Sequence, residues 1–192
     1  YAYSITAHLA TGDDITLKDG NYLANNATSV TTVKPVGGYA YYKDGVLTLN
    51  NYNYSGTGYT YATGSSAAIY ASADLAITLA GSGNTIRCTS GSGIVAEGDL
   101  TVSGSTAFTV SGSATAVKTN SFAAETTAFT ANGYINGRNG VNIKAKDDVI
   151  VTNGWVGDNE STAVSSIVSE TGSVKLSATT NTLNINGVID IT

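Results

Sequence analysis

Proline, cysteine and methionine are almost absent from this chain of 192 residues, which contains one proline, one cysteine and no methionine. Because proline has no N–H to donate, its scarcity fits a structure in which most backbone N–H groups donate to β ladders. The single cysteine, Cys88, excludes an internal disulfide and any metal site built from several cysteines. Cys88 lies in a strand-like stretch, and we expect it to be a small buried side chain.

Charged residues are also scarce, at 12% of the chain, and the nine Lys and Arg residues are spread thinly. With a net charge of −5 and no concentrated basic surface, we expect no nucleic-acid partner. No stretch approaches the roughly 18–20 apolar residues of a membrane-spanning helix, so we expect no membrane insertion. The β-branched content distinguishes the chain from a disordered Gly/Ser-rich sequence. A composition rich in Thr, Asn, Gly and Tyr indicates an extracellular or cell-surface protein, and the chain could be part of a longer one.

A pair of apolar residues, two positions apart, recurs at intervals of about 25 residues. The pairs are Ile15/Leu17, Leu47/Leu49, Leu75/Ile77, Leu100/Val102, Phe122/Ala124, Val149/Val151 and Val174/Leu176. A further apolar residue precedes most of the later pairs, and a third apolar group follows each pair after a turn-like cluster of Gly, Asn and Ser. Three short strands and three corners per unit are typical of one coil of a parallel β-helix, in which each coil pairs with and covers the next.

The sequence therefore predicts an all-β fold, a single-stranded right-handed parallel β-helix (β-solenoid) of about six to seven coils, in one domain spanning residues 1–192. Residues 1–40 are less regular and are expected to form an N-terminal cap and first strand, with stacked coils over residues 41–192. The first members of the later pairs, from Leu75 to Val174, should form one column. The alternative is an antiparallel β-sandwich, which also has short strands with turns about every 8–12 residues. The common period favours the β-helix, because a sandwich does not require one.

Three segments carry a resemblance to a known family: residues 44–56, residues 68–86 with Asp74-Leu-Ala-Ile-Thr-Leu79, and residues 93–104 with Asp99-Leu-Thr-Val-Ser-Gly104. They resemble the right-handed β-helix surface proteins of gut and cellulolytic bacteria that are labelled "carbohydrate-binding domain-containing". The resemblance covers about residues 40–112. It implies a shape similar to that of pectate lyases and implies polysaccharide binding, but it assigns no binding residues.

Tyrosine is concentrated in one part of the chain, because eight of the twelve lie between positions 39 and 70. The spacing of two in Tyr52/Tyr54 and in Tyr59/Tyr61 places each pair on one face of a strand. A flat ring with a hydroxyl at its tip can stack on a sugar ring and also form hydrogen bonds. These four tyrosines are therefore the candidate carbohydrate-binding residues. The alternative is that the rings cover the junction between cap and coils, or form an exposed β ladder.

Aspartate precedes several of the apolar pairs, and Asp74 and Asp99 should fall in adjacent coils. A Ca²⁺ ion between the two carboxylates would relieve their repulsion, which makes them candidate metal ligands. The simpler interpretation is that each carboxylate accepts backbone N–H groups in its own corner.

Catalytic chemistry finds little support in the sequence. His8 is the only histidine, which argues against Ser-His or Cys-His catalysis. The glutamates occupy separate coils, whereas glycoside hydrolysis needs two carboxylates in one cleft. No acidic cluster accompanies Arg87 or Arg138, as a lyase-like site would require. Trp155 should fill the core, or stack on a sugar if it points outward.

These observations predict a non-catalytic module that binds an extracellular polysaccharide or a host or bacterial surface glycan, with no catalytic residues and no required cofactor. The first alternative is a structural or adhesive segment of a larger surface protein with no small ligand. A polysaccharide lyase-like enzyme ranks third.

Overall fold

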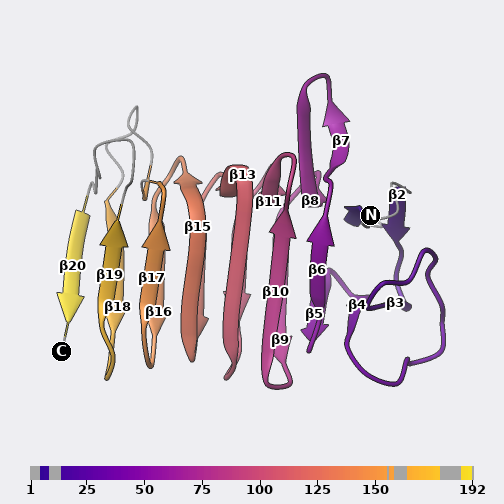
Figure 1. Ribbon diagram of the computed structural model, residues 1–192, viewed down its shortest axis with the longest axis horizontal. Helices are drawn as coiled ribbons and strands as arrows, with labels where there is room; N and C mark the ends of the chain where they lie inside the picture. The colour runs from indigo at the N-terminus through magenta and orange to yellow at the C-terminus, as the bar shows by residue number, and fades with distance from the viewer. Residues whose placement is uncertain (1–4, 9–13, 155, 158–163, 178–186, 192) are drawn as a thin grey trace.

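The computed structural model describes residues 5–8, 14–154, 156–157, 164–177 and 187–191 (Figure 1). Across these ranges the chain forms strands, turns and bends without a helix, which confirms the all-β prediction. No helix there could cross a membrane. Trp155 lies outside the described residues.

The strands form two sheets, of eleven and nine strands. The eleven-stranded sheet contains β1 (Ile5–His8), β2 (Asp14–Leu17), β6 (Asn53–Gly56), β7 (Tyr59–Ala62), β8 (Ser65–Ala71), β10 (Gly83–Cys88), β11 (Ser92–Ala96), β13 (Ala107–Thr119), β15 (Ala128–Gly137), β17 (Val149–Thr152) and β19 (Val174–Ser177). The nine-stranded sheet contains β3 (Asn21–Ala24), β4 (Tyr39–Lys43), β5 (Val46–Asn50), β9 (Leu75–Ala80), β12 (Leu100–Ser103), β14 (Phe122–Thr126), β16 (Val141–Ala145), β18 (Ser165–Ser169) and β20 (Gly187–Ile191).

Parallel pairing dominates both sheets from β8 and β9 onward. In the nine-stranded sheet, β5, β9, β12, β14, β16, β18 and β20 are parallel neighbours in that order. In the eleven-stranded sheet, the order β8, β11, β13, β15, β17 and β19 is also parallel. Each time the chain returns to a sheet it therefore adds a strand beside the previous one. An antiparallel sandwich is incompatible with this pairing.

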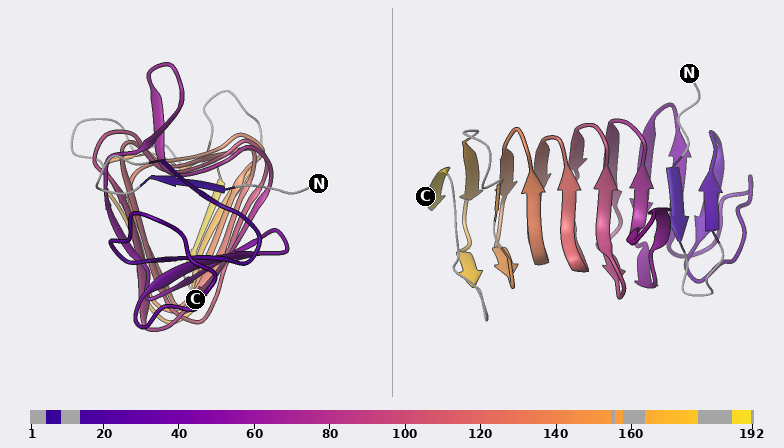
Figure 2. Two further views of the ribbon diagram at one scale, coloured as in Figure 1. Left: turned by 90° about the vertical axis from the view of Figure 1, so that its right-hand side faces the viewer. Right: turned by 90° about the horizontal axis from the view of Figure 1, so that it is seen from above.

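The eleven-stranded sheet bends along a line that crosses its long strands. The first part of β13 pairs with β10, and its last part pairs with β11. Its register with β15 shifts between Ser111 and Thr115, as at a β-bulge. The sheet thus has two limbs, and with the nine-stranded sheet they make three faces. Seen along the long axis, successive turns of the chain superpose on a roughly triangular outline (Figure 2).

Side chains alternate between the interior and the outside, and the predicted apolar pairs up to Val151 point inward. Leu75, Leu100 and Phe122 are register partners, as expected. The column then continues to Val141, whereas Val149 and Val174 pair with each other in the other sheet. The predicted single column is therefore wrong beyond Phe122. Both sheets carry inward apolar pairs, and the chain returns from Phe122 to its partner Val141 after only 19 residues. A constant interval of about 25 residues therefore selects Val149, which lies in the other sheet.

The interior is filled by close packing of these columns. Phe129 lies with its ring centroid 5.8 Å from Phe122 and 6.2 Å from Phe108, which links the two sheets. Cys88 is buried, as predicted, and burial raises the pKa of its thiol. Several polar side chains are also buried, and among them Asn84 accepts a hydrogen bond from the Tyr52 backbone N–H and donates one to the Ala80 carbonyl.

Antiparallel pairing is confined to the N-terminal part of the described chain. It joins β1 to β2 and β8, β3 to β4, β4 to β5, and β7 to β8. Asp44 and Gly45 connect β4 to β5 with positive φ angles of 51° and 81°, the conformation of a two-residue hairpin turn. The strands β2 and β3 end the two sheets, and the apolar side chains of Ile15 and Leu17 are buried there. The antiparallel region thus extends past residue 40, through β8.

Candidate functional site

Two of the four tyrosines predicted to bind carbohydrate are core residues. Tyr52 is 2% exposed and Tyr54 is 5% exposed, and burial raises the pKa of both hydroxyls. Tyr54 is the register partner of Ile86, one of the inward-facing residues. The Tyr54 hydroxyl donates to the Thr57 carbonyl oxygen. A sugar-stacking platform that includes Tyr52 and Tyr54 is therefore wrong, because the inward register removes both rings from the surface.

The other two predicted tyrosines lie on a hairpin that projects from the body of the molecule (Figure 1). Tyr59 and Tyr61 belong to β7, which pairs with β8, and both side chains are half-buried. Tyr61 stacks on Tyr70 of β8, with ring centroids 4.5 Å apart and an interplanar angle of 8°. Tyr59 approaches the same ring at 6.1 Å. The three rings, called here the hairpin tyrosines, replace the predicted platform as the aromatic surface of this region.

A hollow of about 390 Å³ lies beside the hairpin tyrosines. The hairpin contributes Tyr61, Ser65 and Ser66, and β13 contributes Thr115 and Lys118. The hydroxyl groups and the single ammonium group make this wall polar, while Tyr61 supplies an apolar face. The hollow can therefore accept a ligand that combines hydroxyl groups with a flat hydrophobic side.

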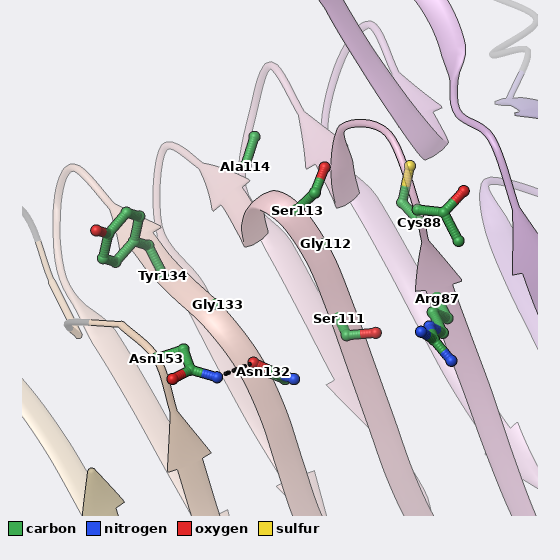
Figure 3. Close-up of a pocket in the computed structure, with 11 residues that line it drawn as sticks. Arg87, Cys88, Ser111, Gly112, Ser113, Ala114, Asn132, Gly133, Tyr134 and Asn153 are labelled. Atoms are coloured by element: carbon green, nitrogen blue, oxygen red, sulfur yellow. Dashed lines mark hydrogen bonds between the residues drawn. The ribbon is translucent and has the colours of Figure 1, made fainter. Parts of the chain in front are cut away.

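A second hollow, of about 400 Å³, lies at the bend of the eleven-stranded sheet and is called here the corner pocket. Figure 3 shows Arg87, Ser111 and Asn132 on three successive strands of one limb, with Asn153 beside Asn132 and Tyr134 near the bend. The two hollows share Ser113 and Ala114 in their linings, and so lie on the two sides of one corner.

The local sequence explains why the corner pocket is open. Arg87 pairs with Ser111 and Ser111 pairs with Asn132, so these three outward side chains lie next to one another. The next residues are Cys88, whose side chain turns inward, and the glycines Gly112 and Gly133. A Cβ on Gly112 would lie 2.0 Å from the Thr115 carbonyl oxygen, so the tight bend requires glycine there. The floor of the pocket therefore carries no large side chain.

Hydrogen bonds fix the rim of the corner pocket. The Asn153 side-chain amide donates to the Asn132 side-chain oxygen at 2.9 Å. Ser113 Oγ accepts the Gly91 backbone N–H at 2.8 Å. Asn153, directly after β17, has a φ of 60°, a left-handed conformation that asparagine tolerates better than most residues. The polar groups are thus held in place by neighbouring turns of the chain.

The charge of the two hollows limits their chemistry. Their linings contain the cations Arg87 and Lys118, and none of the described residues that line either hollow is Asp or Glu. A pair of carboxylates for general acid and base catalysis is therefore missing from these linings. Cys88 also borders the corner pocket, but the raised pKa of its buried thiol disfavours the thiolate that a nucleophile needs. Both hollows offer hydrogen-bond donors and acceptors.

The two candidate metal ligands form part of a hydrogen-bonded ladder at another corner. Asp74 Oδ1 accepts the Asp99 backbone N–H at 2.9 Å. Asp99 Oδ1 in turn accepts the Ser121 hydroxyl at 2.6 Å and the Asn120 amide at 3.0 Å. The Ser121 hydroxyl, followed by the Asn120 amide, lowers the pKa of the Asp99 carboxyl. The simpler interpretation expected the backbone N–H donor to Asp74 to come from its own corner. The donor, Asp99, lies instead in the next turn of the chain.

The same arrangement recurs at a second corner, where Asp148 Oδ1 accepts both the backbone N–H and the hydroxyl of Ser173. Hydrogen bonding thus already engages the carboxylates that a cation would need. Within the described part of the chain, no three His, Cys, Asp or Glu side chains form a group that could hold a metal ion. Calcium binding at Asp74 and Asp99 remains a prediction without further support.

Sequence reasoning missed several residues of these hollows, although a signal for some of them was present. Tyr70 follows Ile69, which faces inward, and strand alternation therefore points Tyr70 outward. Arg87, Ser111 and Asn132 each precede the residue at which one strand turns the corner, but only the three-dimensional register brings them together. A scan of protein-family models, a search of curated proteins and a search of solved structures all find no match to this chain. Function is therefore inferred from the chemistry of the site.

Proposed function

We propose that the chain is a right-handed parallel β-helix of about six to seven coils that belongs with the bacterial surface proteins it resembles. The parallel register of both sheets and the superposed turns in Figure 2 support this architecture. Residues 1–40 would form the cap, helped by the antiparallel strands that end both sheets. The protein would act outside the cell or on its surface, within a longer chain.

We propose further that this β-helix binds polysaccharide without catalysis. The observation that carries the proposal is the corner pocket, a hollow lined by a guanidinium, amides, hydroxyls and a tyrosine, without a carboxylate. Ring hydroxyls of a sugar both donate and accept hydrogen bonds, and this lining offers partners of both kinds. The hairpin tyrosines, with Tyr61 at the neighbouring hollow, supply flat rings for stacking on sugar faces. The partner would be a polysaccharide or a surface glycan.

A structural or adhesive role without a small ligand is the second candidate. The burial of Tyr52 and Tyr54 favours it, because the tyrosine-rich segment then contributes to the core as well as to the surface. The hydrogen bonds that Asp74 and Asp148 accept also stabilise corners of the fold, a structural role that needs no ligand. An enzyme is the third candidate, and depolymerisation of pectin in the presence of Ca²⁺ would establish it.

The direct test is retention on insoluble polysaccharides and binding to a glycan array, with wild-type protein and the variants Tyr61→Ala and Tyr134→Ala. Loss of one stacking ring is expected to weaken binding by about two- to tenfold. Tyr41→Ala is the matched control, because Tyr41 stacks on Tyr22 in the antiparallel part of the chain and lines neither hollow.

Failure of wild-type protein to bind any glycan would refute the proposed function and favour the structural role. Equal binding by wild type, Tyr61→Ala and Tyr134→Ala, with a loss only in Tyr41→Ala, would move the site to the N-terminal strands.

A further inference from the structure

The corner pocket is built by successive turns of the chain and not by one loop. Arg87 comes from β10, Ser111 from β13 and Asn132 from β15, and these residues are neighbours in the parallel register. Asn153 follows β17, the next strand along, and is hydrogen-bonded to Asn132. Four adjacent turns therefore each contribute a polar side chain to one hollow (Figure 3).

The hollow is longer across the strands than along them. Neighbouring strands lie about 4.8 Å apart, so the three steps from β10 to β17 span about 14 Å. Along β13, which has the longest stretch in the lining, the three steps from Ser111 to Ala114 cover about 10 Å at the rise of a strand, and the sheet bends within that distance. A linear ligand therefore fits best when it runs from strand to strand.

An extended chain of pyranose sugars advances, with each unit, by a length close to one strand spacing. We infer that a linear polysaccharide lies in the corner pocket parallel to the long axis of the molecule, with one sugar unit over each of the four strands. This inference rests on the proposed function and adds the class of ligand, an extended polysaccharide, and its direction.

The side chains support this placement strand by strand. The Arg87 guanidinium offers several donors at one end, and the Ser111 hydroxyl donates and accepts in the middle. At the other end, the hydrogen bond between the Asn132 and Asn153 amides fixes both side chains, and the Nδ2 group of Asn132 is a further donor. Gly112, in the floor between them, has no side chain that would hold a sugar away from the backbone.

The test is a length series. Binding of cello-oligosaccharides, xylo-oligosaccharides and oligogalacturonides, each from dimer to hexamer, would be measured by isothermal titration calorimetry with the full chain. In a series that binds, the affinity should rise about three- to tenfold with each unit up to the tetramer, the gain of about one net hydrogen bond per sugar, and then level off. Equal affinity for dimer and tetramer would overturn the inference alone. Absence of binding in all three series would overturn the inference, together with the proposed function for these glycans.

Two variants locate the ligand. Arg87→Gln should remove the gain between trimer and tetramer, because the end strand loses most of its donors. Ser111→Trp should block the middle of the pocket and abolish any gain beyond the dimer, with an unchanged circular dichroism spectrum showing that the fold is intact. Arg138→Gln, at an exposed arginine outside the pocket, is the control and should leave the length dependence unchanged. If Arg87→Gln behaves like Arg138→Gln at every length, the ligand does not lie across β10.

Discussion

The substitution Asn84→Ala tests how far the interior depends on one polar side chain. Asn84 is 3% exposed; its Oδ1 accepts the Tyr52 backbone N–H at 2.8 Å, and its Nδ2 donates to the Ala80 carbonyl at 3.0 Å. Alanine would leave the Tyr52 N–H without its acceptor, at a cost of about 1–3 kcal/mol for a buried donor. The Ala80 carbonyl still accepts a hydrogen bond from the Asn51 backbone N–H at 3.3 Å. Loss of the bond from Asn84 Nδ2 to this carbonyl therefore costs only about 0.5–1.5 kcal/mol.

The expected loss in the free energy of unfolding is therefore about 1.5–4.5 kcal/mol, a large share of the roughly 5–15 kcal/mol typical of a domain. Guanidinium unfolding, followed by far-UV circular dichroism, measures it. Asn142→Ala is the control, because Asn142 is exposed on the outer face of β16, and it should change stability by less than about 0.5 kcal/mol. If Asn84→Ala falls within the same range, the Tyr52 N–H has another partner and the reasoning fails.

A second substitution at the same position gives a pH signature. Asn84→Asp keeps an acceptor for the Tyr52 N–H, but an ionised carboxylate would face the Ala80 carbonyl oxygen in a buried place. Burial should raise the pKa of the introduced carboxyl above its unfolded value of about 3.9. The variant should therefore be closest to wild type at acid pH, and it should lose stability as the pH rises through the folded-state pKa. A stability difference from wild type that does not change with pH would contradict this expectation.

Three further outcomes are expected. Tyr52→Ala should destabilise the fold by about 3–5 kcal/mol, as for a large core side chain, whereas Tyr61→Ala should have a much smaller effect. Similar losses of stability in thermal unfolding of the two variants would contradict the different burial of the two side chains. The pKa of the Asp99 carboxyl is lowered in the folded state, so its ionised form adds stability above the unfolded pKa, and this stability is lost as the pH falls through the folded pKa. Asp99→Asn should therefore flatten the acid limb of a plot of unfolding midpoint against pH. Gly112→Ala should destabilise the fold by about 1–3 kcal/mol or more, because the new Cβ would meet backbone atoms. Gly83→Ala should be tolerated, because its Cβ would lie 4.0 Å from the nearest atom. Equal stability of the two variants in chemical unfolding would refute the need for glycine at the bend.

The tyrosines show where prediction from the sequence succeeded and where it could not. The spacing of two correctly predicts that the members of each pair have similar surroundings, because Tyr52 and Tyr54 are both buried and Tyr59 and Tyr61 are both half-buried. It does not say which face, because alternation fixes only the relation between neighbours. Register decides for Tyr54, which pairs with inward-facing Ile86, and the projecting hairpin decides for Tyr61. Half of the candidate platform was therefore core.

The corner pocket was beyond the reach of sequence reasoning for a related reason. Arg87, Ser111 and Asn132 are separated by more than twenty residues at each step, and no local pattern links them. They meet because parallel pairing aligns the strands that carry them and because the sheet bends at the same place in each. The Asp74 and Asp99 carboxylates were correctly placed in adjacent turns, but the structure alone showed that hydrogen bonds from the following turn engage them.

The sequence by itself determined that the chain forms short strands with inward apolar pairs separated by Gly, Asn and Ser corners. This information is local, because alternation and turn chemistry depend on residues a few positions apart. Only the tertiary structure decided which strands lie side by side. The turn of the chain from Phe122 to Val141 is short, and the later strands therefore lie on other faces than a constant interval of about 25 residues predicts. The surface that a ligand would meet depends on that register, and so the site emerged only when the strands were stacked.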